Sequence, residues 1–232
     1  MKIMSHSYAH LMPEETSTPR SAEEVEARAR SRLYRLVGHA FAFPDTALHE
    51  ELAGGAWERS VAEAVAALPF SLGLADLSLT PTQTTNEELK AEYVRLFEVG
   101  LTGGPPCSLF AGHHERDRLR VMEELVRFYD FFGLGLAPGT MPDHLTAELD
   151  FMHFVTFREA EAVREGGDRG SYLRAERDFL ERQLGRFLAR LVENARAQKP
   201  LPFYEGLLET AHRFAQADYG YVVAALDGFE AS

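Results

Sequence analysis

Residues 141–152 read Met-Pro-Asp-His-Leu-Thr-Ala-Glu-Leu-Asp-Phe-Met. Pro142 fixes the backbone at the entry to a helix. Asp143 is predicted to cap that helix, because an aspartate at this position accepts hydrogen bonds from free backbone N–H groups. His144 and Glu148 are four residues apart and therefore share one helix face. The stretch predicts a long helix that carries a histidine–carboxylate pair beside apolar residues near its start.

The same helical pattern recurs along the rest of the chain. Apolar residues repeat at intervals of three and four, and Gly or Pro residues mark most of the boundaries. The predicted helices span 21–43, 45–52, 56–68, 85–97, 115–132, 143–165, 171–197 and, as one or two helices, 203–229. Capping boxes open two of them, at Ser21 and at Thr85. Strand signals are nearly absent, so we expect an all-α bundle of about eight or nine helices.

The length and composition are typical of one globular domain. Of the 232 residues, 45% are hydrophobic and 26% are charged, which is ordinary for a globular chain. A domain of this size buries roughly 70% of its unfolded surface and needs no disulfide or metal for stability. Residues 1–20 contain two prolines and many small polar residues, and are predicted to form a flexible tail. The helical domain is predicted to occupy residues 21–232.

Charge and hydropathy restrict the partners and the location. The chain has 24 basic and 36 acidic residues and a net charge of −12. An acidic surface repels phosphate backbones, so nucleic acid is not an expected partner. It would attract a basic peptide, although acidity also serves solubility. No apolar stretch is long enough to span a membrane, and no export signal or Arg-Arg pair is present. A cytoplasmic protein without stable membrane insertion is expected.

Motifs of common enzymes are missing from the sequence. There is no Gly-x-Gly-x-x-Gly after a strand, no Walker loop and no Gly-x-Ser-x-Gly elbow. The single cysteine, Cys107, can form no internal disulfide or Cys-only metal site. A catalytic pair of Cys107 with His113 or His114 is a weak alternative. We therefore expect no catalytic residue, no bound cofactor and no enzyme activity.

A second informative stretch precedes a loop rich in Gly and Pro. Residues 92–97 read Glu-Tyr-Val-Arg-Leu-Phe, and their apolar stripe is more typical of a core than of a binding site. Residues 105–110 then read Pro-Pro-Cys-Ser-Leu-Phe. The two prolines prevent a helix there, which leaves aromatic and aliphatic side chains on an irregular backbone.

Together the three stretches resemble the TorD-like family of redox-enzyme maturation chaperones, which includes DmsD and NarJ. The family pattern has a Glu-Tyr-x-x-Leu-Phe helix, a Pro-rich loop with a Ser and an aromatic residue, and Pro-Asp-His-Leu-x-x-Glu-Leu-x-Phe-Met. The order and separations also fit from about Ser31 to Phe214. The chain looks most similar to the branch that serves dimethylsulfide dehydrogenase, ethylbenzene dehydrogenase or selenate reductase.

The resemblance implies an all-helical chaperone that binds the twin-arginine signal peptide, or the N-terminal segment, of a molybdopterin-containing catalytic subunit. It would hold that subunit back until the molybdenum cofactor is inserted. The implied peptide-binding residues are Tyr93, Leu96, Phe97, Pro106, Ser108, Phe110, Pro142, Asp143, His144 and Glu148. The loop departs from the family at Pro106 and Phe110, where an aromatic and a Tyr are usual, and this departure bears on the identity of the cargo.

The alternative is a metal enzyme built in a helical bundle. Di-iron bundles use Glu-x-x-His on two helices and a Glu on each of two others. Residues 209–212 match this motif, residues 150–153 carry Asp in place of Glu, and Glu92 or Glu124 could supply the rest. Such pairs arise by chance among 9 His and 36 acidic residues, so we expect no metal. A scaffold subunit that stays in the mature redox complex is a third possibility.

Overall fold

Helices make up nearly all the regular structure of the protein, which is described from a computed structural model covering residues 20–100 and 104–230. The helices are α2 (Ala22–Ala40), α3 (Thr46–Ala53), α4 (Ala56–Ala66), α5 (Asn86–Tyr93), α6 (Arg118–Phe131), α7 (Leu145–Glu165), α8 (Gly170–Phe179), α9 (Gly185–Gln198) and α10 (Pro202–Glu230). Two π turns, η1 (Val94–Glu98) and η3 (Leu180–Leu184), and one 3-10 turn, η2 (Ala111–His114), complete them. The all-α prediction is confirmed; the predicted tail, apart from Arg20, lies outside the described residues.

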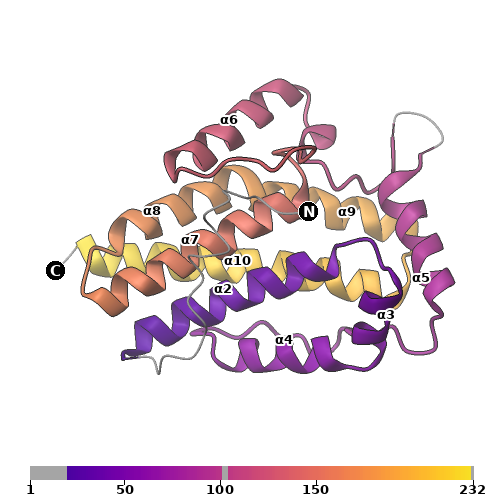
Figure 1. The fold of residues 1–232 in the computed structure, drawn as a ribbon, viewed down its shortest axis with the longest axis horizontal. Helices are drawn as coiled ribbons and strands as arrows, with labels where there is room; N and C mark the ends of the chain where they lie inside the picture. The colour runs from indigo at the N-terminus through magenta and orange to yellow at the C-terminus, as the bar shows by residue number, and fades with distance from the viewer. Residues whose placement is uncertain (1–19, 101–103, 231–232) are drawn as a thin grey trace.

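The core lies between α2 and α7, which pack along most of their lengths, with α10 against α8 and α9 (Figure 1). Leu33 and Val37 of α2 and Phe151 of α7 are fully buried there, as the helical periodicity requires. Tyr34 and Phe214 pack at the contact with α10, with their rings tilted by 44° and their centroids 4.4 Å apart. α6 lies outside this core along one edge of the molecule, and α4 lies along the opposite edge.

The two predicted capping boxes have different outcomes. Thr85 Oγ1 accepts the N–H of Glu88 at 3.2 Å, and Glu88 accepts the N–H of Thr85 at 2.8 Å, so this box is confirmed. Ser21 likewise accepts the N–H of Glu24 at 3.2 Å. The prediction of the reciprocal bond from Glu24 to Ser21 is wrong, however, because the Glu24 carboxylate accepts the N–H of Arg20 instead, at 2.8 Å.

The helix predicted from 115 begins three residues later than expected. Asp117 caps it by accepting the N–H of Arg120 at 3.1 Å, so α6 starts at Arg118. The predicted end near residue 132 agrees with the structure, where α6 ends at Phe131. An aspartate ahead of a helix provides this cap for otherwise unpaired backbone N–H groups.

The helix predicted over 171–197 is continuous from Gly170 to Gln198 but contains the π turn η3. Counted as one helix, α8, η3 and α9 leave eight helices within the residues described. A Cβ at Gly185 would lie 2.5 Å from the carbonyl oxygen of Leu180. The widened turn therefore depends on glycine at this position, a local requirement that helical periodicity does not reveal.

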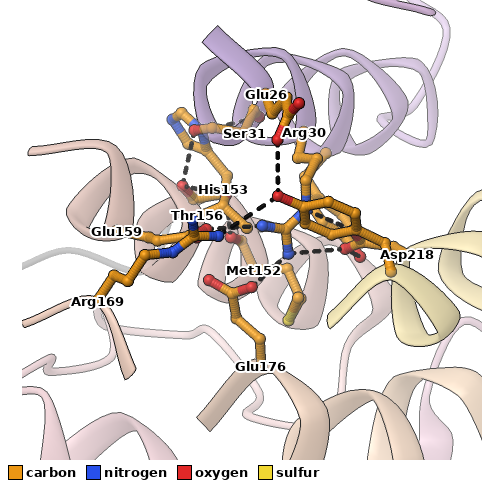
Figure 2. A network of polar contacts seen from close by, with 12 residues as sticks. Glu26, Arg30, Ser31, Met152, His153, Thr156, Glu159, Arg169, Glu176 and Asp218 are labelled. Carbon is orange, nitrogen blue, oxygen red and sulfur yellow. Dashed lines mark hydrogen bonds and ion pairs between the residues drawn. The ribbon is translucent and has the colours of Figure 1, made fainter. Parts of the chain in front are cut away.

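A buried arginine joins four helices at the centre of the bundle (Figure 2). Arg30 of α2 is fully buried, and its Nη1 lies 2.6 Å from Glu159 of α7. Its Nη2 contacts Glu176 of α8 and its Nε contacts Asp218 of α10. Asp218 also accepts the hydroxyl of Tyr34 at 2.6 Å. One guanidinium thus determines how α2, α7, α8 and α10 meet.

A second arginine joins this buried cluster. Arg169 adds a second cation, 2.8 Å from Glu159. Burial would lower the pKa of Arg30, but the surrounding carboxylates raise it well above its ordinary value. Burial raises the pKa of Glu176 well above its ordinary value, which favours its neutral form. Two arginines therefore lie among three buried carboxyl groups, and each carboxyl group contacts at least one guanidinium in the low-dielectric interior.

Among residues 20–100 and 104–230, none of the helices combines the length and the apolar character needed to cross a membrane.

Candidate functional site

The loop that follows η1 joins the sequence stretches that predict function. The N–H of Cys107 donates to the carbonyl of Leu96 at 2.9 Å, and the N–H of Leu145 donates to the carbonyl of Leu109 at 2.7 Å. Residues 104–114 therefore run from the end of η1 to the start of α7. The three stretches form one connected unit, as their resemblance to a single family pattern implies.

The start of α7 differs from the prediction. The N-cap is His144, whose side chain accepts the N–H of Thr146 at 3.2 Å, so the assignment of Asp143 as the cap is wrong. Asp143 is fully buried instead. Its Oδ2 accepts the N–H of Gly112 at 3.2 Å and lies 3.5 Å from Nε of Arg118. Its carboxylate therefore holds the loop and α6 against the start of α7. These partners are distant in sequence, so local sequence could not reveal this role.

Gly112 permits this close approach. A Cβ at Gly112 would lie 2.8 Å from Oδ2 of Asp143 and 2.4 Å from Cγ of Arg118. We expect Gly112→Ala to lower the free energy of unfolding by about 1–3 kcal/mol, because it displaces both partners of a buried carboxylate. Chemical denaturation measures this. Gly220→Ala is the control, since nothing lies within 4 Å of its Cβ; equal stability of the two variants would contradict the assigned role of Gly112.

Ser108 holds the loop together. Its Oγ lies 2.7 Å from Nδ1 of His113 and accepts the N–H of Phe110 at 3.2 Å. Its carbonyl oxygen lies 2.8 Å from Nε2 of His114. Cys107 is buried, and burial raises the pKa of its thiol to about 11. Both histidines thus contact Ser108 while the thiol stays protonated, which gives no support to a catalytic Cys–His pair.

The ten side chains predicted to bind peptide differ in exposure. Seven are buried: Tyr93, Leu96, Phe97, Ser108, Pro142, Asp143 and Glu148. Three are partly exposed: Pro106, Phe110 and His144. Most of the predicted peptide-binding side chains therefore lie beneath the surface and not on it.

A groove of about 620 Å³ opens beside His144, between the end of α2 and the start of α7. Of the predicted residues, Tyr93 and His144 line it. Phe43 forms another part of its wall and is 46% exposed, with its ring edge-on to Tyr93 at 5.5 Å. The groove is a concave and mostly apolar surface of the size that binds small ligands or short peptide segments.

Sequence reasoning missed the contribution of α2 to this groove. Leu36, Phe41, Ala42 and Phe43 line it together with Thr146 and Asp150 from α7. One signal could have indicated Phe43. It stands directly before Pro44, where the backbone is unlikely to be helical, so an aromatic ring there need not belong to the helical core.

Two polar side chains along the groove, His144 and Tyr93, are uncharged at neutral pH. Burial lowers the pKa of His144 to about 4, so its ring is neutral, and it meets the ring of Phe110 edge-on at 4.9 Å. Burial, with Glu98 nearby, raises the pKa of Tyr93 to about 12. The Tyr93 hydroxyl donates to the carbonyl of Phe41 at 3.2 Å. These groups suit a ligand with an apolar segment.

Glu148 lies on the core side of α7. It is fully buried, and neither carboxyl oxygen has a hydrogen-bond partner among the residues described. Burial, and next the charge of Asp143, raise its pKa well above the ordinary value, so it favours the neutral form. The predicted His144–Glu148 pair is therefore divided between two environments: His144 reaches the groove, and Glu148 remains in the core.

Several of the side chains considered for a di-iron site have other partners. Glu92 pairs with Arg95 at 2.6 Å, His153 lies 2.8 Å from the hydroxyl of Ser31, and Glu209 pairs with Arg196 at 2.7 Å. Within residues 20–100 and 104–230, no three His, Cys, Asp or Glu side chains gather as a metal site requires. This arrangement gives the metal-enzyme alternative no support.

Comparison with known proteins relates the chain to a family. Residues 55–193, more than half of the chain, match the family model described as nitrate reductase delta subunit. The perchlorate reductase assembly chaperone protein of Dechloromonas aromatica (strain RCB) is 35% identical, over 82% of this chain and 88% of its own length. The selenate reductase assembly chaperone protein of Thauera selenatis is 36% identical, over 67% of this chain and 70% of its own.

A third relative aligns along almost the whole chain. The dimethyl sulfide dehydrogenase assembly chaperone protein of Rhodovulum sulfidophilum is 31% identical, over 95% of this chain and 93% of its own length. The resemblance stated from the sequence motifs is confirmed, including the branch, since selenate reductase and dimethyl sulfide dehydrogenase both occur among these names. The chain therefore belongs to the nitrate reductase delta subunit family.

Proposed function

We propose that this protein is the dedicated assembly chaperone of one molybdopterin-containing redox enzyme, and that it binds the twin-arginine signal peptide or N-terminal segment of the catalytic subunit. Its named relatives are assembly chaperones, so its role is chaperoning and not catalysis. The client subunit is held until the cofactor is inserted, and the chaperone acts in the cytoplasm, where a subunit awaiting export is made.

The observation that carries the proposal is the groove beside His144. It joins an exposed aromatic residue, Phe43, to the predicted residues Tyr93 and His144. An apolar groove bordered by helices receives the apolar part of a peptide. A large apolar side chain left exposed beside such a groove is typical of an interaction site.

Charge favours a basic segment beside that apolar part. The chain carries −12 overall. Asp150 lines the groove together with one arginine, Arg35, and the exposed Glu98 lies close enough to Tyr93 to raise its pKa. Arginine prefers carboxylate partners, and a long-range acidic field speeds the encounter with a basic peptide. A twin-arginine signal has both an arginine pair and an apolar segment, so it fits this combination.

The groove can be tested with one exposed side chain. We expect Phe43→Ser to weaken binding of a labelled twin-arginine peptide about tenfold, since a ring that becomes buried in an interface is a typical hot spot. Its melting temperature should stay near that of the wild type, because exposed positions alter stability little. Fluorescence anisotropy and thermal unfolding on the same samples measure both quantities.

Phe229→Ser is the matched control. Phe229 is 45% exposed, close to the 46% of Phe43, but it lies near the end of α10 and does not line the groove. Replacing both arginines of the peptide by Gln, or raising the salt concentration, should also weaken binding. If Phe43→Ser and Phe229→Ser bind the peptide equally well, the groove is not the peptide site.

A further inference from the structure

A second concave surface is lined by α6 and by the continuous helix α8–η3–α9. Figure 1 shows α6 at the top of the view, above α8. One hollow, of about 540 Å³, lies between residues 114–124 and 182–190. Another, of about 500 Å³, lies between residues 124–132 and 171–182. The two share Glu124 and Arg182, so they form one elongated depression, here called the α6 trough. None of the predicted peptide-binding residues lines it.

The first hollow is cationic in an otherwise acidic protein. Five arginines line it against three carboxylates, Glu115, Asp117 and Glu124. Each carboxylate is already engaged: Glu115 with Arg190 at 2.6 Å, Glu124 with Arg120 at 2.9 Å, and Asp117 at the N-terminus of α6. Arg116, Arg182 and Arg186 have no ion pair with any residue that the structure describes. Arg182 lies close enough to Glu124 to help lower the pKa of that carboxyl, but none of the three guanidinium groups is held in a direct ion pair.

Helix geometry sets the arginines in a row. Arg182, Arg186 and Arg190 are four residues apart and therefore lie on one face, over a length of about 12 Å. Arg182 belongs to the π turn η3. Such turns occur frequently at functional sites, because the extra residue redirects side chains within a helix. Arg116 and Arg120 stand on the opposite wall.

The second hollow is aromatic. Phe128, Phe131 and Phe132 of the α6 side line it, and Phe131 is 80% exposed. Arg127 and Arg174 flank these rings. Arg127 pairs with Glu123 at 3.9 Å. Two adjacent phenylalanines beside these arginines form an exposed apolar patch with a cationic border, which is typical of a protein interaction surface.

We propose that the α6 trough binds an acidic segment of the client protein that also carries apolar residues. The chaperone then holds its client at two places of opposite charge, a basic segment at the groove beside His144 and an acidic segment at the trough. The client's identity rests on the proposed function, whereas the selectivity of the trough does not. A small anion would occupy the arginine hollow alone and leave Phe131 exposed, while a peptide covers both hollows.

The dimensions agree with a short peptide. From Arg174 to Arg190 the helix advances about 24 Å, the length of roughly seven residues of extended chain. Carboxylates at one end would pair with the arginine row in bidentate geometry. An aromatic or aliphatic side chain at the other end would cover Phe131 and Phe132.

The test uses the full-length protein and a fluorescein-labelled peptide of about twelve residues that alternates Glu with Leu and Phe. We expect Arg182→Glu/Arg186→Glu to weaken its binding at least about tenfold, as reversal of two contacting charges does, and Phe131→Ser to weaken it several-fold. The matched control is Arg59→Glu/Arg158→Glu, which changes the net charge equally at exposed positions outside the trough. All variants should bind the twin-arginine peptide like the wild type.

Several outcomes would overturn the proposal. Equal loss of binding in both double variants would show that only net charge matters. Tight binding of inorganic tripolyphosphate with no binding of the acidic peptide would make the trough a small-anion site. A wild-type dimer that dissociates in Arg182→Glu/Arg186→Glu, without peptide binding, would make it a contact between two copies. Failure of the twin-arginine peptide to bind, with the acidic peptide bound as described, contradicts the proposed function and leaves the trough assignment standing.

Discussion

Arg30→Met should lower the free energy of unfolding by about 3–5 kcal/mol, the cost of removing one partner from a buried ion cluster. The substitution keeps most of the side-chain volume but leaves Glu159, Glu176 and Asp218 without the guanidinium that contacts all three. These carboxyl groups are fully buried, so water cannot replace the lost partner. They would repel one another or take up protons, and either response weakens the folded state.

The control lies two residues away on the same helix. Arg32 pairs with Glu63 at 2.9 Å, but the two side chains are 34% and 67% exposed. Arg32→Met should therefore cost less than about 1 kcal/mol, the usual range for exposed pairs. Urea denaturation of both variants measures the contrast. A loss at Arg30 no greater than the loss at Arg32 would show that the buried cluster contributes little net stability.

His153→Gln and Glu148→Gln should change the pH dependence of stability in opposite directions. Burial lowers the pKa of His153 to about 4, whereas an unfolded histidine titrates near 6.5. Between pH 7 and pH 5, His153 binds a proton in the unfolded state but stays neutral in the folded state. His153 therefore contributes stability that is present above pH 6.5 and is lost as the pH falls, by about 2 kcal/mol at pH 5.

Glu148 has the opposite sign. Its folded pKa is raised by burial and by Asp143, so the folded state keeps a proton that the unfolded state has released. Its contribution to stability is present at low pH and is lost as the pH rises from about 4.5 toward the raised value. Glu148→Gln keeps the shape of the side chain but cannot ionise, so it removes this pH-dependent loss of stability. It should therefore stabilise the protein at pH 7 by about 1–3 kcal/mol.

The measurement is the free energy of unfolding at pH 7 and at pH 5 for the wild type and both variants. In each protein, the change in the free energy of unfolding from pH 7 to pH 5 is compared with that of the wild type. His153→Gln should shift this change toward greater stability at pH 5, and Glu148→Gln should shift it toward lower stability at pH 5. Surface groups contribute equally to all three proteins and cancel in these differences. Parallel pH curves would mean that neither residue keeps its folded protonation state.

The paired carboxyl and histidine of residues 141–152 show where sequence reasoning reached its limit. Their spacing of four correctly predicts a helix, since the backbone repeat is local. It could not show that Glu148 is buried with no hydrogen-bond partner among the described residues, while His144 reaches a groove. That division depends on which face of α7 packs on α2, and this packing is decided by contacts far apart in the chain.

By itself, the sequence determined the helical class, most helix boundaries, the absence of common enzyme motifs and, through three motifs, the family. These properties follow from short-range spacing, caps and turn residues, which act within a few positions of the chain. Only the tertiary structure decided that Asp143 holds Gly112 and is not a cap, that Phe43 borders the groove, that Arg30 joins four helices, and that unpaired arginines line the α6 trough. Each brings together residues separated by tens of positions or more, and their meeting depends on how whole helices pack.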